Sequence, residues 1–261
     1  MHRFTVWRYL SLEKFEWLLA DNGLYFSRAD QQEDPDEGGY HEKQMIADLN
    51  SATEDKYLKE NVVMRHRNIR ELNRRTTYLS CWHKNSQENQ AMWDKFAPEG
   101  ADVVIQSNLM YLITQIPKGL TEVITPDDCD YDKSKAGVGN QRNFKFKDEK
   151  YAPENEFRLY IDSGTLYYKT NIRFDNALMV EVGNQTAYAA DYSDNVTAPG
   201  TIFKKNEYGL VVAYNLQRLI NSVHTSPNAT EAQKNHIRQL LHKAGLDIPV
   251  VSSSLQANPI A

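Results

Sequence analysis

The chain has 261 residues, of which 41% are hydrophobic and 11% aromatic, so it can bury a sizeable core and is not expected to be disordered. The formal charge of −5 excludes a globally basic nucleic-acid-binding surface, and two cysteines are too few for a disulfide framework or a zinc ribbon. The N-terminal sequence lacks an apolar signal segment, and no apolar run reaches the roughly 18 residues of a membrane span. We expect a cytoplasmic protein without membrane contact, built as a single α+β domain over residues 1–261.

The opening residues predict a strand, a helix and a second strand. The sequence FTVWRYL at 4–10 alternates as a strand does, and LEKFEWLLADNG after it has the periodicity of an amphipathic helix. Ser11 suits the N-cap of this helix, and Gly23 suits the left-handed position after its end. LYFS at 24–27 then predicts a short strand.

Arg8 lies in the middle of the aromatic first strand, between Trp7 and Tyr9. Burying a charge without a partner costs on the order of several kcal/mol. Arg8 therefore either faces water from an edge strand or reaches a carboxylate, a backbone carbonyl or a ligand phosphate.

An acidic tail follows the second strand, with five carboxylates inside eight residues. Dense carboxylates can bind a hard cation, but the alternating ligands and central glycine of a calcium-binding EF-hand loop are missing. A turn held by Pro35 is the simpler interpretation, and it would place Asp34 or Glu37 near Arg8 or at the rim of a cleft. The acids are Asp30, Glu33, Asp34, Asp36 and Glu37.

The segment 40–75 is predicted to be a helical insertion of two or three polar helices. Its end, MRHRNIRELNRR at 64–75, carries five arginines against one glutamate. This run suits contact with nucleic acid, and it equally suits a solvated helix face. The arginines are Arg65, Arg67, Arg70, Arg74 and Arg75.

The sequence TTYLSCWH at 76–83 predicts a central strand, and a helix capped by Ser86 is expected over 86–97. Cys81 and His83 would point to one face of that strand, as a cysteine–histidine nucleophile pair requires, although a small core cysteine is the commoner explanation. Trp82, and Trp93 beyond the turn, suit the wall of a pocket that stacks on a flat ring.

The rest of the chain continues the mixed pattern. Strands are predicted at 101–107, 121–125, 157–161, 166–170, 177–182 and 208–214, with a short helix at 108–115. The Gly-, Lys- and Asn-rich segment 130–150 predicts a mobile loop, and the part from about 214 to 245 predicts helices, the second capped by Asn228 or Thr230. The fold class is therefore α+β, with a mixed β-sheet core, flanking helices and a helical C-terminal part.

Glu154, Glu156 and Arg158 share one face at the start of the strand near 157–161. They form either a surface salt-bridge strip of little energetic value or a site where the arginine holds a carboxylate in position. A buried glutamate that binds sugar hydroxyls and stabilises an oxocarbenium-like centre is the chemistry of ribosyl transfer.

Several short motifs together resemble the bacterial family known as domain of unknown function 2971. They are Trp7-Arg8-Tyr9, LYFS followed by DPDE, SCW leading to Met92-Trp93, and the E-x-E-x-R of 154–158. The resemblance spans most of the chain, and it implies a family but no activity. Gln32 and Asp36 depart from the family pattern, which has an aromatic or apolar residue at the first position and a bulky one at the second.

A looser resemblance covers about a third of the chain and concerns ADP-ribosyltransferase domains of the DarT type and the RNA 2′-phosphotransferase type. It implies a NAD-dependent transferase in which Arg8 and Glu156 act in catalysis, with Glu154 as the rival carboxylate. The cofactor-binding residues implied are Arg8, Tyr9, Phe26, Ser80, Trp82, Trp93 and Arg158. Proteins of this sort resemble bacterial toxins or phage-defence effectors that modify nucleic acid or protein. An antitoxin or regulatory protein would control such an enzyme.

Two other functions remain open at this point. A metal-dependent nuclease or hydrolase would use Asp34, Glu37, Glu154 and Glu156 around a divalent ion, provided that these carboxylates converge. A non-catalytic binding module of a defence system would place Arg8 and Glu156 on opposite sides of the molecule.

Overall fold

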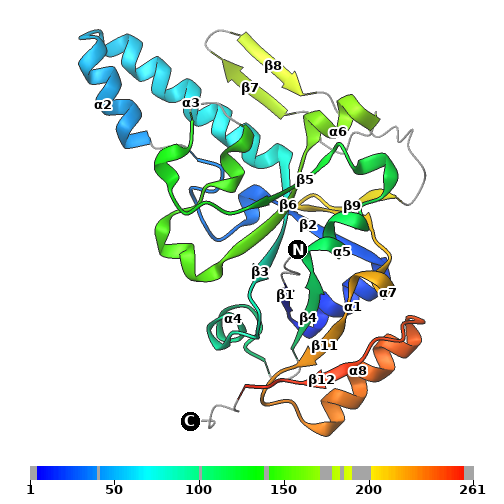
Figure 1. The fold of residues 1–261 in the computed structure, drawn as a ribbon. Coiled ribbons are helices and arrows are strands. Elements are labelled where there is room, and N and C mark those ends of the chain that lie inside the picture. The colour runs from blue at the N-terminus through cyan, green and yellow to red at the C-terminus, as the bar shows by residue number, and fades with distance from the viewer. Residues whose placement is uncertain are drawn as a thin grey trace.

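The computed structural model describes residues 5–39, 42–99, 102–137, 141–170, 178–182, 185–189 and 201–255. The fold is α+β, as predicted: a mixed sheet carries helices around it, and a separate ribbon pairs β7 with β8 (Figure 1). The main path of the sheet runs β12-β11-β4-β1-β3-β2-β10-β9, and β6 and β5 continue from β3. All of its pairs are antiparallel except β11 with β12, which is parallel.

The strands are β1 (Thr5–Leu10), β2 (Gly23–Arg28), β3 (Thr77–Lys84), β4 (Val103–Asn108), β5 (Ile124–Asp128), β6 (Glu156–Asp162), β7 (Leu178–Val182), β8 (Gln185–Ala189), β9 (Ile202–Asn206), β10 (Gly209–Ala213), β11 (Ser222–Thr225) and β12 (Val250–Ser252). The α-helices are α1 (Leu12–Asp21), α2 (Glu42–Ala52), α3 (Lys56–Thr76), α4 (Gln90–Phe96), α5 (Leu109–Thr114), α6 (Ser163–Thr170), α7 (Leu216–Leu219) and α8 (Glu231–Lys243). Short 3₁₀ turns include η1 (Ala29–Gln31) and η5 (Glu149–Glu154).

The sheet forks at β3, and this fork determines where the functional cavity lies. One end of β3 pairs with β1, at Trp7↔His83, and the other end pairs with β2, at Ser27↔Leu79. Among the described strands, residues 80–82 between these two points pair only with β6. Strands β1 and β2 therefore leave β3 in different directions, β1 to join β4 and β2 to join β10, and a gap opens between them.

Helix α1 lies between β1 and β2, as the sequence predicts, and so connects the two arms of the fork. Its N-cap is Ser11, whose hydroxyl accepts a hydrogen bond from the backbone N–H of Lys14. The left-handed residue at its end is Asn22 (φ 46°) and not Gly23, which is already the first residue of β2. Gly23 is required for another reason, since a Cβ there would lie 2.4 Å from the carbonyl oxygen of Val212 on the neighbouring β10.

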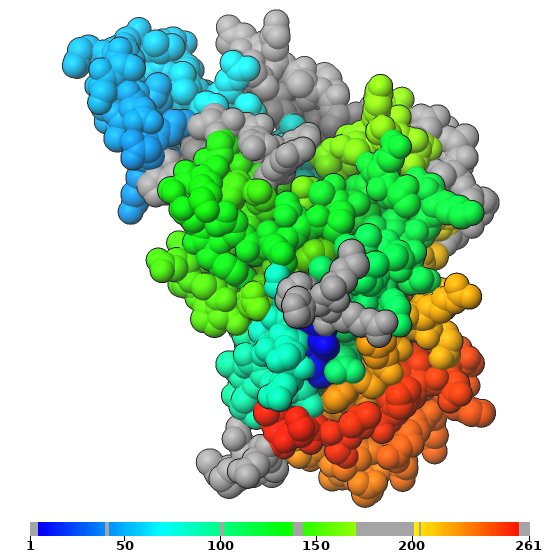
Figure 2. Space-filling view, viewed as in Figure 1, coloured from blue at the N-terminus to red at the C-terminus, as the bar shows by residue number. Residues whose placement is uncertain are grey.

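The predicted helical insertion is present as α2 and α3, which project from the rest of the molecule (Figures 1 and 2). Two local predictions in the middle of the chain are wrong. Helix α4 begins at Gln90 with Asn89 as its cap, so Ser86 is not the N-cap. The sequence LYYKT belongs to helix α6 and not to a strand. In the region predicted as a mobile loop, Gln141–Lys145 form a 3₁₀ turn in which Phe144 is buried, and a second 3₁₀ turn, Glu149–Glu154, begins at its end.

The C-terminal part is less helical than predicted. Helix α7 ends after one turn, and Ser222 begins β11, which adds to the edge of β4. Helix α8 follows, and Thr230 caps it in a complete capping box with Gln233. None of the helices in the described parts of the chain is long and apolar enough to cross a membrane.

Candidate functional site

A cavity of about 550 Å³ opens at the fork of the sheet. Its walls come from β1, β2 and β3, from residues 31–37 after β2, and from the segment that leads into β6. Its volume is within the roughly 300–1,000 Å³ range of ligand-binding pockets. Arg8, Trp82 and Glu156 all line it, so the predicted arginine, aromatic ring and carboxylate lie around one space and not on opposite sides of the molecule.

The Arg8 guanidinium bridges the two arms of the fork. Its Nη1 donates to Ser80 Oγ (3.0 Å), its Nη2 donates to the backbone carbonyl of Tyr25 (2.9 Å), and its Cζ lies 5.7 Å from the centre of the Trp82 ring. All of these partners are neutral, and no carboxylate among the described residues pairs with Arg8. Burial lowers the pKa of Arg8 to about 10, so the group is still cationic at neutral pH.

This arrangement leaves an uncompensated positive charge at the cavity wall. A guanidinium has five N–H donors, and only two of them are engaged by Ser80 and Tyr25. Arg8 can therefore keep both protein contacts and still donate to an anionic ligand, which is what a partly desolvated cation without a counter-ion favours.

Several aromatic residues contribute to the cavity. Trp7, Tyr9, Tyr25 and Trp82 all line it. The Tyr9 hydroxyl accepts a hydrogen bond from the backbone N–H of Asn89 (2.9 Å), so its ring is held in place. Trp7, Tyr9 and Trp82 are each 8% exposed or less, so Tyr25 is the ring among these four that presents a partly exposed apolar surface to a base or a pyridine ring.

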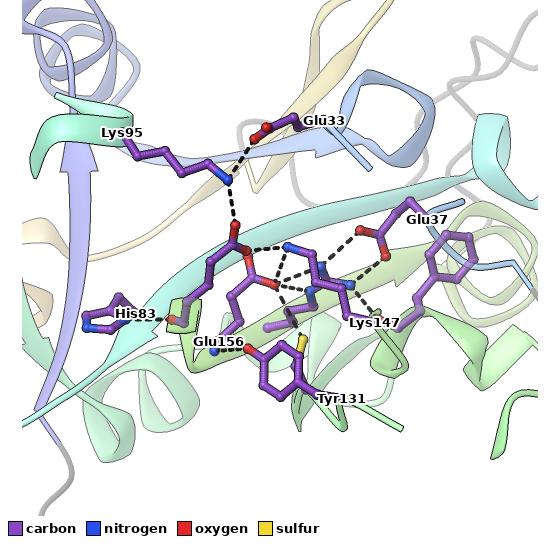
Figure 3. Close-up of polar contacts among 11 residues, drawn as sticks. Glu33, Glu37, His83, Lys95, Tyr131, Lys147 and Glu156 are labelled. Carbon is purple, nitrogen blue, oxygen red and sulfur yellow. Dashed lines mark hydrogen bonds and ion pairs between the residues drawn. The ribbon is translucent and has the colours of Figure 1, made fainter. Parts of the chain in front are cut away.

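A buried ion network lies at the cavity wall, where Glu37, Lys147, Glu154 and Glu156 line the space (Figure 3). Arg158 binds both oxygens of Glu37 (2.6 and 3.0 Å), and its side chain and that of Glu37 are each 1% exposed. Arg158 also donates to Glu156 Oε2 through Nε (2.9 Å), and the backbone carbonyl of Phe144 accepts from its Nη1 (2.6 Å). Arg158 thus fixes the loop after β2 against the start of β6.

Glu154 and Glu156 differ in how much of each carboxylate is occupied. Glu154 pairs one oxygen with Lys95 (2.7 Å) and the other with Lys147. The hydrogen bonds that described residues donate to the Glu156 carboxylate, from Lys147, Arg158 and Cys129, all reach Oε2. Oε1 of Glu156 is therefore the carboxylate oxygen available to a ligand in this part of the cavity.

Glu156 is held in its ionised form. Burial by itself would raise the pKa of Glu156, but the charges of Arg158 and Lys147 outweigh burial and lower it to about 2. The backbone N–H of Glu156 donates to the Tyr131 hydroxyl (2.7 Å), which fixes the start of the strand. A rigid, permanently ionised carboxylate can stabilise developing positive charge without having to lose a proton first.

Two buried polar atoms of the cavity wall have no hydrogen-bond partner among the described residues: Asp34 Oδ2 and His83 Nε2. Asp34 is 3% exposed, and its Oδ1 accepts from the backbone N–H of Asp36 (2.9 Å). His83 is 6% exposed, and its Nδ1 lies 2.5 Å from the backbone carbonyl oxygen of Glu154. Buried polar groups are nearly always paired, so these two atoms indicate where a ligand or water makes contact.

Cys81 lies near His83 on the cavity wall, but its thiol is not activated. Burial raises the pKa of Cys81 to about 12, whereas a nucleophilic cysteine needs a lowered pKa. The cysteine–histidine nucleophile pair is therefore not supported by the environment of the thiol.

Four residues predicted to bind a cofactor lie outside the cavity lining. Phe26 is fully buried in the main hydrophobic core, because alternation along β2 turns it away from Tyr25 and Ser27. Ser80 and Arg158 are buried behind the wall, where they hold Arg8 and Glu156 respectively. Trp93 packs edge-to-face on Tyr9 and donates to Glu88, so it supports the wall from outside.

The predicted nucleic-acid arginines are on α3 and away from the cavity lining. Three of the five are engaged by carboxylates: Arg67 by Glu42, Arg70 by Asp36 and Arg75 by Glu71. An arginine whose charge is already paired gains less from a phosphate, so the structure weakens the case for α3 as a nucleic-acid contact.

Lys95 and Lys147 are site residues that were not predicted from the sequence. Lys95 connects Glu33 of the acidic loop (2.9 Å) to Glu154, and Lys147 lies between Glu154 and Glu156 (Figure 3). Lys147 comes from a segment rich in lysines. The alternation FKFK at 144–147, in which Phe144 and Phe146 are buried, is the signal in the sequence that this stretch packs against the protein.

These cations also bear on metal binding. Glu37, Glu154 and Glu156 are each neutralised by an arginine or a lysine. Within the described ranges, no group of three or more histidine, cysteine, aspartate or glutamate side chains is placed to hold a metal ion. The carboxylates of a metal-dependent nuclease would need to converge without such partners.

Comparison with known proteins adds no family assignment, since the chain matches no protein-family model, no curated protein and no solved structure. The function of the cavity is therefore inferred from its own chemistry.

Proposed function

We propose that the protein is a NAD-dependent ADP-ribosyltransferase-like enzyme whose active site is the cavity at the sheet fork. The observation that supports this most directly is the uncompensated Arg8 cation in a cavity that also presents an ionised glutamate. NAD supplies the complementary features: a pyrophosphate anion, two flat ring systems and ribose hydroxyls.

In this proposal Arg8 binds the phosphates of NAD. Its hydrogen bonds to Ser80 and Tyr25 hold the guanidinium plane before the ligand arrives, so little side-chain freedom remains to be lost on binding. Tyr9 and Trp82 also line the cavity, and in this proposal they support the wall around the nicotinamide ring.

Glu156 is the catalytic carboxylate, and Glu154 is a positioning residue. Cleavage of the bond between the ribose and nicotinamide develops positive charge on the ribose, and a fixed carboxylate oxygen stabilises it electrostatically. Oε1 of Glu156 is free for that role, whereas both oxygens of Glu154 bind lysines. Lys147 and Arg158 hold Glu156 from behind.

The first test is a thermal-shift measurement with NAD. A ligand that binds only the folded state at about 100 times its dissociation constant adds about 2.7 kcal/mol of stability. For a chain of this size that corresponds to a rise in Tm of about 5 to 10 °C. Arg8→Gln should abolish the rise, while Glu122→Gln, an exposed carboxylate paired only with Lys169 in the described structure, should preserve it.

The second test measures release of nicotinamide. We expect Glu156→Gln to lower the rate by about 100-fold or more, as loss of a transition-state electrostatic contact does. The melting temperature and far-UV spectrum of each variant separate loss of catalysis from loss of folding. A wild-type protein that neither gains stability with NAD nor releases nicotinamide from it, in the presence of nucleic acid or protein acceptors, would refute the proposal.

The wider context follows the resemblances found in the sequence. We propose a cytoplasmic bacterial toxin or defence effector that modifies nucleic acid or protein and is controlled by an antitoxin or regulatory protein. The metal-dependent hydrolase finds less support, because its carboxylates are neutralised by cations.

A further inference from the structure

The hydrogen bond of His83 Nδ1 determines the tautomer of its ring. Its Nδ1 faces the backbone carbonyl of Glu154 at 2.5 Å, and a carbonyl can only accept a hydrogen bond. Nδ1 must therefore carry the proton, and in the neutral ring Nε2 is a lone pair. This lone pair lies in the cavity wall without a partner among the described residues.

Asp34 presents a second unpartnered hydrogen-bond acceptor. Its Oδ2 is buried in the wall of the same cavity, while its Oδ1 is engaged by the backbone of Asp36. Each of these two buried acceptors is satisfied by a ligand or water that supplies an O–H or N–H group, just as Arg8 favours an anion at the fork.

His83 stands directly beside Glu156. The two residues face each other across β3 and β6 in the antiparallel register, which places the Cβ atoms of such a pair roughly 4.5–5.5 Å apart on one face of the sheet. Both side chains line the cavity. His83 thus belongs to the wall of the same cavity as the carboxylate that stabilises the reacting ribose.

We propose that His83 is the general base of the transfer reaction and that the acceptor is a neutral hydroxyl or amine, which Asp34 helps to orient. The inference depends on the proposed ADP-ribosyl transfer. The lone pair of the acceptor oxygen or nitrogen forms a bond to C1′ of the ribose. The bond from C1′ to the nicotinamide nitrogen breaks, nicotinamide leaves neutral with that electron pair, and the acceptor proton moves to His83 Nε2.

The charged and titratable groups around His83 come from three elements. Tyr9 on β1 lies with its ring centre 6.3 Å from that of His83, Glu156 is the neighbour on β6, and η5 contributes the carbonyl of Glu154. The Glu154 and Glu156 carboxylates are themselves paired with Lys95, Lys147 and Arg158.

The test uses small acceptors, with water and methanol as the O–H probes and NAD as the donor. We expect wild-type protein to form ADP-ribose and methyl ADP-ribose, with a rate that rises with pH through one ionisation and then levels. His83→Gln should lower this rate by about 100-fold and remove that ionisation, because general-base catalysis contributes about that factor or more. Its NAD-induced rise in Tm should persist. Added imidazole should restore part of the rate in His83→Gly.

A matched control is His224→Gln, since His224 is also a histidine on a strand but binds Glu88 outside the cavity lining. A His83→Gln variant with a normal rate and a normal pH profile would overturn the inference while leaving the proposed enzyme intact. NAD that binds wild type but is not cleaved with either probe would overturn it as well. Absence of both NAD binding and NAD cleavage would instead refute the proposed function itself.

Discussion

The bidentate pair between Glu37 and Arg158 offers the sharpest test of how the acidic loop is held. Both side chains are 1% exposed, and the two contacts measure 2.6 and 3.0 Å. The change Glu37→Gln keeps the shape of the side chain but removes the charge that balances Arg158. Breaking a buried pair from one side typically costs about 3–5 kcal/mol, because the remaining charge stays desolvated.

The structure favours the lower end of this range. Arg158 keeps Glu156 and the Phe144 carbonyl as partners after the change, so the guanidinium is not left bare. We therefore expect a loss of about 3 kcal/mol in the free energy of unfolding. For a chain of this size, that loss lowers Tm by about 6 to 12 °C.

Urea unfolding followed by tryptophan fluorescence measures the loss, and Asp36→Asn is the matched control. Asp36 is in the same loop and pairs with Arg70, but its side chain is 60% exposed, so its pair is worth about 1 kcal/mol or less. Equal destabilisation by the two changes would contradict the idea that Arg158 anchors the loop through Glu37. A large loss for Glu37→Gln alone is the expected result.

Three further predictions concern single groups of the cavity wall. The Arg8→Met variant should unfold within about 1 kcal/mol of wild type in urea, since the removed cation has no counter-ion among the described residues, but it should lose stabilisation by NAD. Because the pKa of Glu156 is lowered from 4.5 to about 2, its contribution to stability is complete above pH 4.5 and disappears as the pH falls towards 2; in Glu156→Gln the acid limb of a stability–pH profile should be shallower. Because burial raises the pKa of Cys81 to about 12, iodoacetamide at pH 8 should alkylate it roughly a thousandfold more slowly than a free cysteine, as followed by mass spectrometry, and denaturation should abolish the difference.

Local sequence patterns predicted the elements that build the cavity. The strand–helix–strand opening, the two helices of the insertion and the central strand with Trp82 follow from period-two and 3.6-residue patterns together with caps such as Ser11 and Thr230. The position of Arg8 as a charge inside an aromatic strand also identified it as a residue that needs a partner. The failures at α6 and β11 concern short segments, where tertiary pairing decides between helix and strand.

The partner of each acidic residue could not be predicted from the spacing of these residues in the sequence. Asp34 and Glu37 are three residues apart in one loop, and both are buried. Glu37 binds Arg158, whereas Asp34 has an oxygen without a partner among the described residues. Which acid meets the arginine depends on how the loop after β2 docks on β6, and these two elements are more than a hundred residues apart. Glu154 and Glu156 pose the same problem, since their difference rests on Lys95 and Lys147 from elsewhere in the chain.

The fork of the sheet connects these observations. If β1 and β2 were paired with β3 along their full lengths, strand backbone would fill the space that is now the cavity. Instead both strands use the same edge of β3 at different points, and Arg8 crosses the gap to the hydroxyl of Ser80 and the carbonyl of Tyr25. The cation that a ligand would meet is thus also the group that connects the two arms where strand pairing stops. A lysine at this position would keep the charge, but its single nitrogen could not span both contacts and still present a planar face to an anion.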